Sequence, residues 1–435
     1  MIGCRAVRCV VARRSQTGAE HMDNPDDDPQ LDIVAQCWPA ISVDEADAVL
    51  QLLTQPCHAL NVVAQSGRPT AAGAMIHVDN GPDLFIKRYD RSVRDADTIL
   101  PYHRFVAWLA RHGIATPEFL PFRQGGRLGD ARDVGIDGGD GSDSGGDSVD
   151  IACVDDVTVL AAGRRIYEVC RRARGQDRYV DAVTWDPVRN IAQARELGVF
   201  VARIASAAEG FRIPHVANDP FQNRFGLLPV LAVASDRHEV VARWLRERPR
   251  VARYIVGAER DLLRDLEPCR AFAAGLVHDY ATLPPCWTHG DPHCSNFLWE
   301  GDGPVSVIDF GLAAQNTAIF DLVMAIERHC IPWVGIVEGK AVDCRVDMAR
   351  AIVAGWSSVR PLRDAERRVV VQMLPICQVE AALNWIGYYM RDVQGREDAD
   401  WCYDVMFRQH VAWFYGEQGR AFLDDIRRIV NGAHR

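Results

Sequence analysis

The sequence predicts an α+β protein of two lobes, in which a small antiparallel β-sheet with one main helix precedes a larger, mostly helical part. Short strand-like runs separated by turn residues occupy the first part of the chain, whereas apolar residues recur at helical spacing in most of the chain after residue 190. The 435 residues also exceed the usual size of a single hydrophobic core. We therefore expect a sheet lobe at 41–170 and a helical lobe at 171–435.

An N-terminal extension, residues 1–40, precedes the first predicted element. It is rich in arginine as far as Gly18 and then carries the acidic run 23–28. Segments of this composition bury too little apolar surface to fold, so we expect disorder here. Met1 and Met22 are both consistent with the start of the chain.

The sheet lobe begins with a short helix at 42–53. Ser42 followed three residues later by Glu45 is a capping-box pattern, and apolar residues follow at helical spacing. Three strand-like runs come next, with turn residues at 79–82 between the last two. These runs are residues 60–64, 74–78 and 84–88. We expect them to form a meander of antiparallel strands.

The rest of this lobe is predicted to hold the main helix and further strands. The helix is expected at 101–112, closed by Gly113. A strand at 116–120 and a hairpin follow, and the hairpin strands are 156–160 and 165–171. Between the strand at 116–120 and the hairpin, about residues 124–150 are rich in Gly, Asp and Ser and are expected to form a disordered acidic insertion. One nonapeptide there is similar to a calcium-binding repeat, but such repeats fold only when they stack on one another.

Beyond Gly175 the sequence predicts a helical lobe. Apolar residues recur every three or four positions in seven segments. These are 190–208, 240–245, 258–266, 269–280, 347–356, 365–390 and 400–430. We expect most of their aromatic residues in the core and a few beside a substrate pocket.

The stretch 287–311 interrupts these helices and carries residues suited to phosphoryl transfer. Two strand-like runs flank a glycine-containing loop at 300–304 and predict a hairpin. The runs are residues 297–299 and 305–308. Because a hairpin brings its ends together, Asn296 is expected beside Asp309, and their oxygens are ligands that Mg²⁺ accepts. Asp291 on the preceding loop is placed to accept a proton from a hydroxyl group.

Two motifs in this stretch resemble those of a known family. Residues 289–296, His-Gly-Asp-Pro-His-Cys-Ser-Asn, look like the catalytic loop of the aminoglycoside phosphotransferase and choline kinase-like families, which have the protein-kinase-like fold. Residues 308–311, Ile-Asp-Phe-Gly, look like the metal-binding motif that follows this loop. Two ordered motifs joined by a hairpin are a more specific signal than either tetrapeptide alone.

The resemblance implies a role for each matching residue. Asp291 is similar to the catalytic base, and Asn296 and Asp309 are similar to the metal ligands of the catalytic set. His289 is similar to a histidine that braces the loop. Asp321 falls, in a looser match, where the family has an aspartate that supports the loop.

The resemblance also implies a nucleotide site in the sheet lobe. Lys87 resembles the third-strand lysine that contacts the α- and β-phosphates of ATP. Only two of the 49 basic residues are lysines, so a position that keeps lysine is expected to require one; the alternative is a surface lysine at a strand end. By position alone, the loop with Ser66 and Gly67 is assigned to the phosphates, although an ordinary hairpin loop fits equally. The backbone that is expected to bind adenine is that of Glu168, Val169 and Cys170.

The sequence departs from the family at one position of this site. A glutamate partner for Lys87 is expected on the main helix near Tyr102 or His103, and neither residue is a carboxylate. Asp95 or Asp97 at the start of the helix is one substitute, and complete absence of the pair is the other interpretation.

Two other interpretations of the 287–311 stretch remain open. Asp, Asn and Gly are common in loops for backbone reasons alone, so the cluster is also consistent with turn chemistry. A zinc site is the second alternative. Its ligands would be Cys286, His289, His293 and Cys294. Adjacent His293 and Cys294 are an awkward pair for one ion.

Composition narrows the class of protein. The net charge of −10 argues against a general nucleic-acid binder, and no apolar run of the sequence is long enough for a membrane span. The thirteen cysteines have no regular spacing, so we expect reduced thiols and a cytoplasmic protein.

We therefore expect a kinase that uses ATP and Mg²⁺ to phosphorylate a hydroxyl group of a metabolite or an aminoglycoside-like acceptor. A nucleotide-binding pseudokinase is the first alternative and a protein kinase the second. The identity of the acceptor and the oligomeric state are not readable from the sequence.

Overall fold

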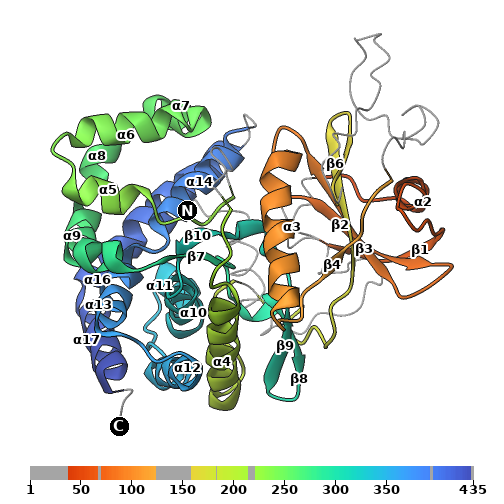
Figure 1. Ribbon diagram of the computed structural model, residues 1–435. Helices are drawn as coiled ribbons and strands as arrows, with labels where there is room; N and C mark the ends of the chain where they lie inside the picture. The colour runs from red at the N-terminus through yellow and green to blue at the C-terminus, as the bar shows by residue number, and fades with distance from the viewer. Residues whose placement is uncertain are drawn as a thin grey trace, which may run out of the picture. The chain divides into compact units, whose positions relative to one another are not determined.

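The computed structural model describes residues 38–66, 70–123, 158–182, 184–213, 221–391 and 395–432. The predicted extension before residue 38, Gly67 and the insertion at 124–150 lie outside these ranges. The described chain forms two compact units (Figure 1). The smaller unit runs to Ala107 and resumes over Thr116–Ala173, and the larger comprises Trp108–Ala115 and the chain from Arg174 onward.

The smaller unit is built on an antiparallel sheet in the order β1-β2-β3-β6-β4, with β5 beside β6. Its elements are α2 (Val43–Leu50), β1 (Ala59–Ser66), β2 (Ala72–Val78), β3 (Leu84–Asp90), α3 (Ala96–Arg111), β4 (Glu118–Phe119), β5 (Leu160–Ala162) and β6 (Arg165–Arg171). The predicted meander is confirmed, and the α2 and α3 helices lie against opposite faces of the sheet in Figure 1.

Side chains alternate across strand β3 and thereby sort into two faces. Leu84 and Ile86 join the hydrophobic core that α2 covers, so Lys87 between Ile86 and Arg88 projects toward the other face. The predicted capping box at α2 is only half formed. Ser42 Oγ accepts the Glu45 backbone N–H at 3.1 Å, but the Glu45 carboxylate accepts a 2.6 Å hydrogen bond from buried Arg88 instead of capping the helix.

The larger unit is mostly helical, as the sequence predicts. Its elements are α4 (Ile191–Ala207), α5 (Leu227–Val233), α6 (Arg237–Arg246), α7 (Pro249–Gly257), α8 (Leu262–Asp265), α9 (Glu267–Thr282), β7 (Pro285–Thr288), β8 (Phe297–Glu300), β9 (Gly303–Val307), β10 (Ala314–Thr317), α10 (Phe320–Cys330), α11 (Trp333–Val337), α12 (Val346–Val359), α13 (Asp364–Met373), α14 (Val379–Tyr389), α15 (Arg396–Trp401), the π-helical segment η5 (Cys402–Gln409), α16 (His410–Tyr415) and α17 (Glu417–Gly432).

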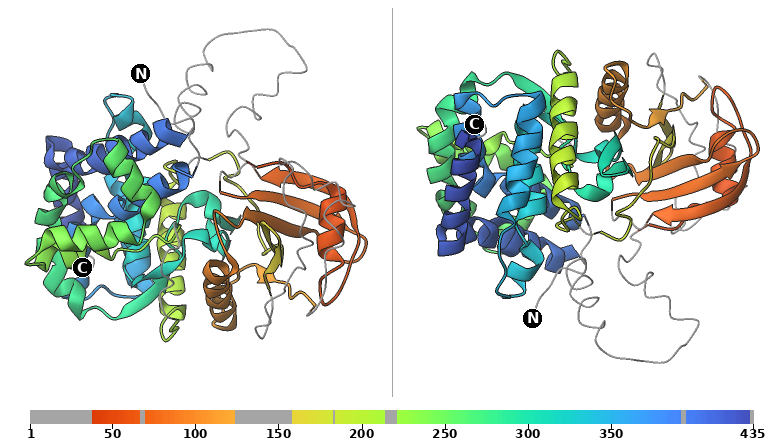
Figure 2. Two further views of the ribbon diagram at one scale, coloured as in Figure 1. Left: turned by 90° about the horizontal axis from the view of Figure 1, so that it is seen from above. Right: turned by 90° about the horizontal axis from the view of Figure 1, so that it is seen from below.

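Helices α4 and α12 run side by side (Figure 2) and approach closely through two glycines. A Cβ atom on Gly198 would lie 2.1 Å from the carbonyl oxygen of Ile352, and one on Gly355 would lie 2.0 Å from that of Arg195. A side chain at either position would therefore push the two helices apart.

Two predicted helices differ in the structure. The segment 258–266 is not one helix, because α7 ends at Gly257 and Glu259 adopts φ = 52° before the short α8 begins. The segment 365–390 is broken by a 3-10 turn at Leu374–Ile376, where Pro375 lacks the N–H of a helical residue. The run Asp364–Tyr389 is apolar and long enough to cross a membrane, but 89% of its most apolar window is buried inside the fold, as in a core helix.

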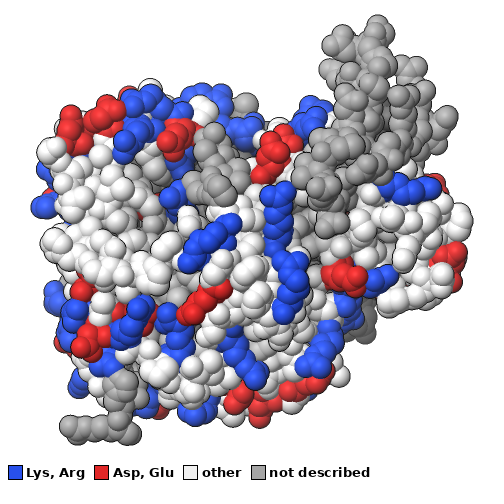
Figure 3. All heavy atoms as spheres, viewed as in Figure 1, with Lys and Arg blue, Asp and Glu red and all other residues white. Residues whose placement is uncertain are grey.

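The surface carries charges of both signs, and the described cysteines are free thiols, as the sequence predicts. Basic and acidic side chains are interspersed on the face shown in Figure 3. Within the described ranges nine cysteines are free and none forms a disulfide.

Candidate active site

The hairpin predicted at 297–308 is formed by β8 and β9. Phe297 pairs with Val307, and Gly301 turns the chain with φ = 57°. The backbone N–H of Ile308 then donates to the carbonyl of Asn296 at 2.9 Å. This bond places Asn296 next to the residue that follows Ile308, which is Asp309.

Asn296 presents a buried amide oxygen without a protein partner. The residue is 1% exposed, and its Nδ2 donates to the carbonyl oxygen of Asp291 at 2.9 Å. Its Oδ1 has no hydrogen-bond partner in the structure. Leaving a buried acceptor unpaired costs about 1–3 kcal/mol, so the orientation of this amide indicates a ligand for a cation. An amide oxygen near a carboxylate fits Mg²⁺, which prefers oxygen ligands.

Asp309 has a backbone conformation that is rare outside glycine. Its φ and ψ are 59° and 66°, in the left-handed region, between strand β9 and a 3-10 turn at Phe310–Leu312. Such a conformation costs about 1–3 kcal/mol and persists where the surroundings enforce it, most often at functional sites. The strain thus falls on a residue that the sequence predicts to be a metal ligand.

His289 and Asp321 brace the loop, as predicted. The Asp321 carboxylate at the start of α10 accepts the backbone N–H groups of His289 at 2.8 Å and Gly290 at 2.9 Å. The His289 Nε2 donates to the carbonyl of Ile308 at 2.9 Å, while its Nδ1 accepts the backbone N–H of Asp291 at 3.2 Å. Burial raises the pKa of Asp321. Through its two hydrogen bonds, His289 ties the loop at 289–296 to the end of the hairpin.

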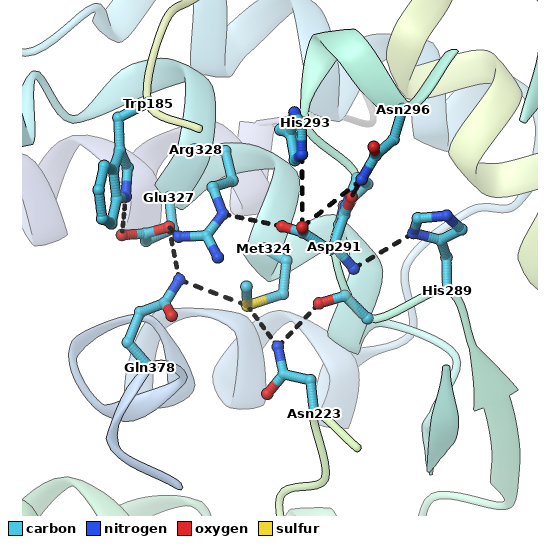
Figure 4. Close-up of polar contacts among 12 residues, drawn as sticks. Trp185, Asn223, His289, Asp291, His293, Asn296, Met324, Glu327, Arg328 and Gln378 are labelled. Atoms are coloured by element: carbon cyan, nitrogen blue, oxygen red, sulfur yellow. Dashed lines mark hydrogen bonds and ion pairs between the residues drawn. The ribbon is translucent and has the colours of Figure 1, made fainter. Parts of the chain in front are cut away.

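Gly290 is required by its surroundings. Its φ is 84°, and a Cβ atom there would lie 2.4 Å from the carbonyl oxygen of Leu312. Asn223 fixes this peptide from the other side, because its Nδ2 donates to the Gly290 carbonyl at 2.7 Å (Figure 4).

The Asp291 carboxylate is held between a cation and a histidine (Figure 4). Arg328 Nε donates to its Oδ1 at 3.2 Å, and His293 Nε2 lies 3.4 Å from its Oδ2. Burial favours the neutral acid, but His293 and Arg328 beside it outweigh burial and hold the pKa of Asp291 well below its usual range. Asp291 is therefore ionised near neutral pH and can accept a hydrogen bond from a hydroxyl group.

Arg328 extends this cluster into the helical core. Its Nη1 donates to Glu327 at 3.0 Å, and the Glu327 carboxylate also accepts Trp185 Nε1 at 3.2 Å and Gln378 Nε2 at 2.8 Å (Figure 4). None of these residues was predicted from the sequence. Arginine is too common in this chain to be a signal, and Trp185 and Gln378 are far from the motifs in sequence.

A cavity adjoins this cluster in the larger unit. Its lining residues are Trp185, Trp333, Val334, Val337, Gln378, Trp401, Val405, Met406 and His410. Most of the wall is apolar, yet Trp333 Nε1, Gln378 Oε1 and His410 Nδ1 are buried without hydrogen-bond partners, while His410 Nε2 lies 3.5 Å from Glu327 Oε1. The π-helical segment η5 supplies Val405 and Met406, and π-helical turns are often found at functional sites.

The residues predicted to bind the nucleotide lie in the smaller unit. Lys87 on β3 is paired with Glu168 on β6. The backbones of Val169 and Cys170 lie between neighbouring strands, since Cys170 pairs with Phe85 of β3 and with Phe119 of β4. The contact of this backbone with adenine stays a prediction. The phosphate role of Ser66, the last residue of β1, also stays a prediction. Gly67 lies outside the described residues.

The structure gives no support to the zinc alternative. Cys286 Sγ points to the carbonyl of Ala205 at 3.9 Å, and Cys294 Sγ to that of Asp186 at 3.5 Å. In the part of the chain that the structure describes, no three His, Cys, Asp or Glu side chains gather as a metal site.

Comparisons with known proteins identify the family. The model of the phosphotransferase enzyme family matches residues 74–362. A homoserine kinase of Phenylobacterium zucineum is 28% identical over 202 residues, which cover 46% of this chain and 52% of that protein. A homoserine kinase of Methylobacterium radiotolerans is 33% identical over 122 residues, covering 26% and 35%. The chain thus spans about half the length, or less, of these curated relatives.

Solved structures with similar folds were also found. Amicoumacin kinase hAmiN in complex with AMP-PNP, Ca²⁺ and Ami has 13% identity and a TM-score of 0.44, with 88% of this chain and 91% of that chain covered. Macrolide 2′-phosphotransferase MphH from Brachybacterium faecium has 16% identity and a TM-score of 0.42, with 82% and 97% covered.

Proposed function

Because the chain belongs to the phosphotransferase enzyme family, we propose that it is an ATP-dependent kinase that phosphorylates a hydroxyl group of a small molecule. The family agrees with the resemblance of the sequence motifs, and the α+β architecture of two units is the one predicted. The observation that carries the proposal is the convergence of Asp291, Asn296 and Asp309, in which the buried Asn296 oxygen lacks a protein partner.

Each residue of this cluster has a part in phosphoryl transfer. Asn296 and Asp309 would hold Mg²⁺, which, when bound, neutralises charge on the nucleotide phosphates. Asp291 accepts the hydrogen bond of the acceptor hydroxyl and takes its proton. Arg328 and His293 keep this carboxylate ionised and fix its direction. Catalysis of this kind depends mainly on positioning and charge, so loss of one member is expected to be severe.

The acceptor is proposed to occupy the cavity beside Trp185. Two of its lining residues, Trp185 and Gln378, hydrogen-bond Glu327, and Glu327 pairs with Arg328, the partner of Asp291. Apolar walls with a few unpaired polar groups suit a compact hydroxylated molecule. Homoserine is the first compound to test because the curated relatives are homoserine kinases, and aminoglycosides follow.

The test is ADP release from ATP and Mg²⁺ with homoserine, other hydroxylated metabolites and aminoglycosides. We expect release that depends on one class of acceptor and is lost in Asp291→Asn. A purified Asp291→Asn variant with normal acceptor-dependent turnover would overturn the assignment. Nucleotide binding without transfer to any acceptor would favour the pseudokinase, and transfer only to folded proteins would favour a protein kinase. A cytoplasmic location stays a prediction.

A further inference from the structure

We propose that Glu168 on strand β6 is the carboxylate that positions Lys87 for nucleotide binding, in place of a glutamate on helix α3. This inference rests on the proposed kinase function. It assigns to the Glu168 side chain a role that differs from the adenine contact predicted for its backbone.

The strand register places Lys87 and Glu168 side by side. They are direct partners in the antiparallel ladder of β3 and β6. Directly opposed residues project from the same face of a sheet, with Cβ atoms about 4.5–5.5 Å apart. The neighbouring pair, Ile86 and Val169, belongs to the core on the opposite face, so Lys87 and Glu168 both face helix α3.

Helix α3 donates hydrogen bonds to a carboxylate at the two positions where the resembled family is expected to have a carboxylate of its own. The Tyr102 hydroxyl donates to Glu168 Oε2, and His103 Nε2 donates to the same oxygen at 2.9 Å. These are the two helix positions at which the sequence lacks the expected glutamate. Donors on the helix and a carboxylate on the strand reverse the expected arrangement but keep a carboxylate near the lysine.

The protonation states support this arrangement. Burial lowers the pKa of His103, so its ring is neutral near pH 7, with the Thr158 hydroxyl donating to Nδ1 at 2.8 Å. Burial opposes ionisation of Glu168, but the hydrogen bonds from His103 and Tyr102 and the nearby charge of Lys87 outweigh it and lower the pKa of Glu168. A buried anion is costly without an opposite charge nearby, and Lys87, its partner in the ladder, supplies one.

Three other charged residues, Arg94, Asp95 and Asp97, stand near the start of α3. Arg94 places its guanidinium carbon 5.1 Å from the ring centroid of Tyr102 and 5.8 Å from that of Tyr89. Asp95 accepts the backbone N–H of Ala96 at 2.6 Å, and Asp97 is exposed. The predicted substitution by Asp95 or Asp97 is therefore not what the structure shows.

The arrangement has a mechanical consequence. A glutamate on a helix reaches the lysine only when the helix is docked, whereas a partner on the adjacent strand is held by the same ladder as the lysine. The ladder therefore keeps Lys87 and Glu168 together whatever the position of α3.

The scarcity of lysine allows a direct test. Lys87 and Lys340 are the only lysines of the chain, so the rate at which an amine-directed acylating reagent modifies each can be followed by mass spectrometry. Lys340, which pairs with Glu338 at 2.6 Å, is the internal reference. Because an adjacent carboxylate favours the unreactive ammonium form, we expect Glu168→Gln to raise the Lys87 rate several-fold relative to Lys340. Glu118→Gln, which removes an exposed carboxylate of the same sheet, should leave the ratio unchanged.

Nucleotide affinity supplies the second readout. We expect Glu168→Gln to bind Mg²⁺·AMP-PNP at least tenfold more weakly, at a temperature where melting curves show that the variant is folded. The double variant Glu168→Gln, His103→Glu returns a carboxylate to the helix and should recover much of that affinity, which repair of the fold alone would not explain.

The outcomes separate this inference from the proposed function. An unchanged labelling ratio in Glu168→Gln would overturn the inference, as would unchanged nucleotide affinity in a wild-type protein that binds nucleotide. A wild-type protein that binds no nucleotide would overturn the proposed function, while the labelling ratio would still report whether Lys87 and Glu168 form a pair.

Discussion

The two candidate sites are assembled in different ways. In the larger unit, Asp291, Asn296 and Asp309 lie within one short stretch, and a hairpin brings them together. In the smaller unit, Lys87 and Glu168 come from strands 81 residues apart in sequence (168 minus 87), and helix α3 completes the group. A local turn specifies the first site, whereas strand register specifies the second.

The largest effects are expected in the larger unit. Asp309→Ala or Asp291→Asn should lower kcat at least about 10³-fold, since these residues act on charge that develops in the transition state. Melting temperature is the control for folding. Near-normal turnover in either variant would show that the contiguous site is not the catalytic one.

Arg328 tests whether the base depends on a residue outside the motifs. Arg328→Gln leaves Asp291 and Glu327 without their shared cation, so the free energy of unfolding should fall by about 3 kcal/mol. His293 still lowers the pKa of Asp291 in this variant, but without Arg328 that pKa should rise, so the acid limb of the activity profile should move to higher pH. Arg328→Lys, which keeps the charge, should restore most of the stability; equal losses in the two variants would contradict an electrostatic role.

His329 adds a pH dependence to stability beside the catalytic loop. Burial lowers its pKa to about 4, and its Nε2 donates to the carbonyl of Pro292 at 3.2 Å. Between pH 6.5 and about 4 the unfolded chain binds a proton that the folded chain does not, so stability falls as the pH falls. Urea titrations at pH 7 and pH 5 should differ by about 2 kcal/mol from this group. His329→Gln should remove that difference; an unchanged pH dependence would assign it to other groups.

The smallest effect on activity is expected from Tyr102, which distinguishes the helix from the strand as the source of the functional group in the smaller unit. Tyr102→Phe removes one of the two α3 donors to Glu168 and leaves His103 in place. The loss of one hydrogen bond to a charged group lowers the free energy of unfolding by about 1.5–3 kcal/mol. The ladder still holds Glu168 beside Lys87. We expect the KM for ATP to rise less than in Glu168→Gln, with kcat nearly unchanged. A larger effect than that of Glu168→Gln would place the functional group on the helix.

The same contrast explains what the sequence could predict. The hairpin, its two ends and the bracing by His289 and Asp321 follow from local spacing and the resemblance, and the structure contains them. The contact of Arg328 with Asp291 depends on the direction in which α10 leaves the loop, which residue types do not encode. The strand partner of Lys87 depends on the register of β3 and β6, which the sequence does not specify. From the sequence, the missing glutamate on the helix was therefore consistent with complete absence of the pair.

A calorimetric titration with AMP-PNP, with and without Mg²⁺, shows whether Asn296 and Asp309 hold the metal of a nucleotide site. The buried Asn296 oxygen and the strained Asp309 form one side of a metal and nucleotide site in this account. We predict tight binding to the wild-type protein only when Mg²⁺ is present, and loss of the Mg²⁺ dependence in Asn296→Ala and Asp309→Ala. Binding that is equally tight without Mg²⁺, or unchanged in both variants, would contradict it.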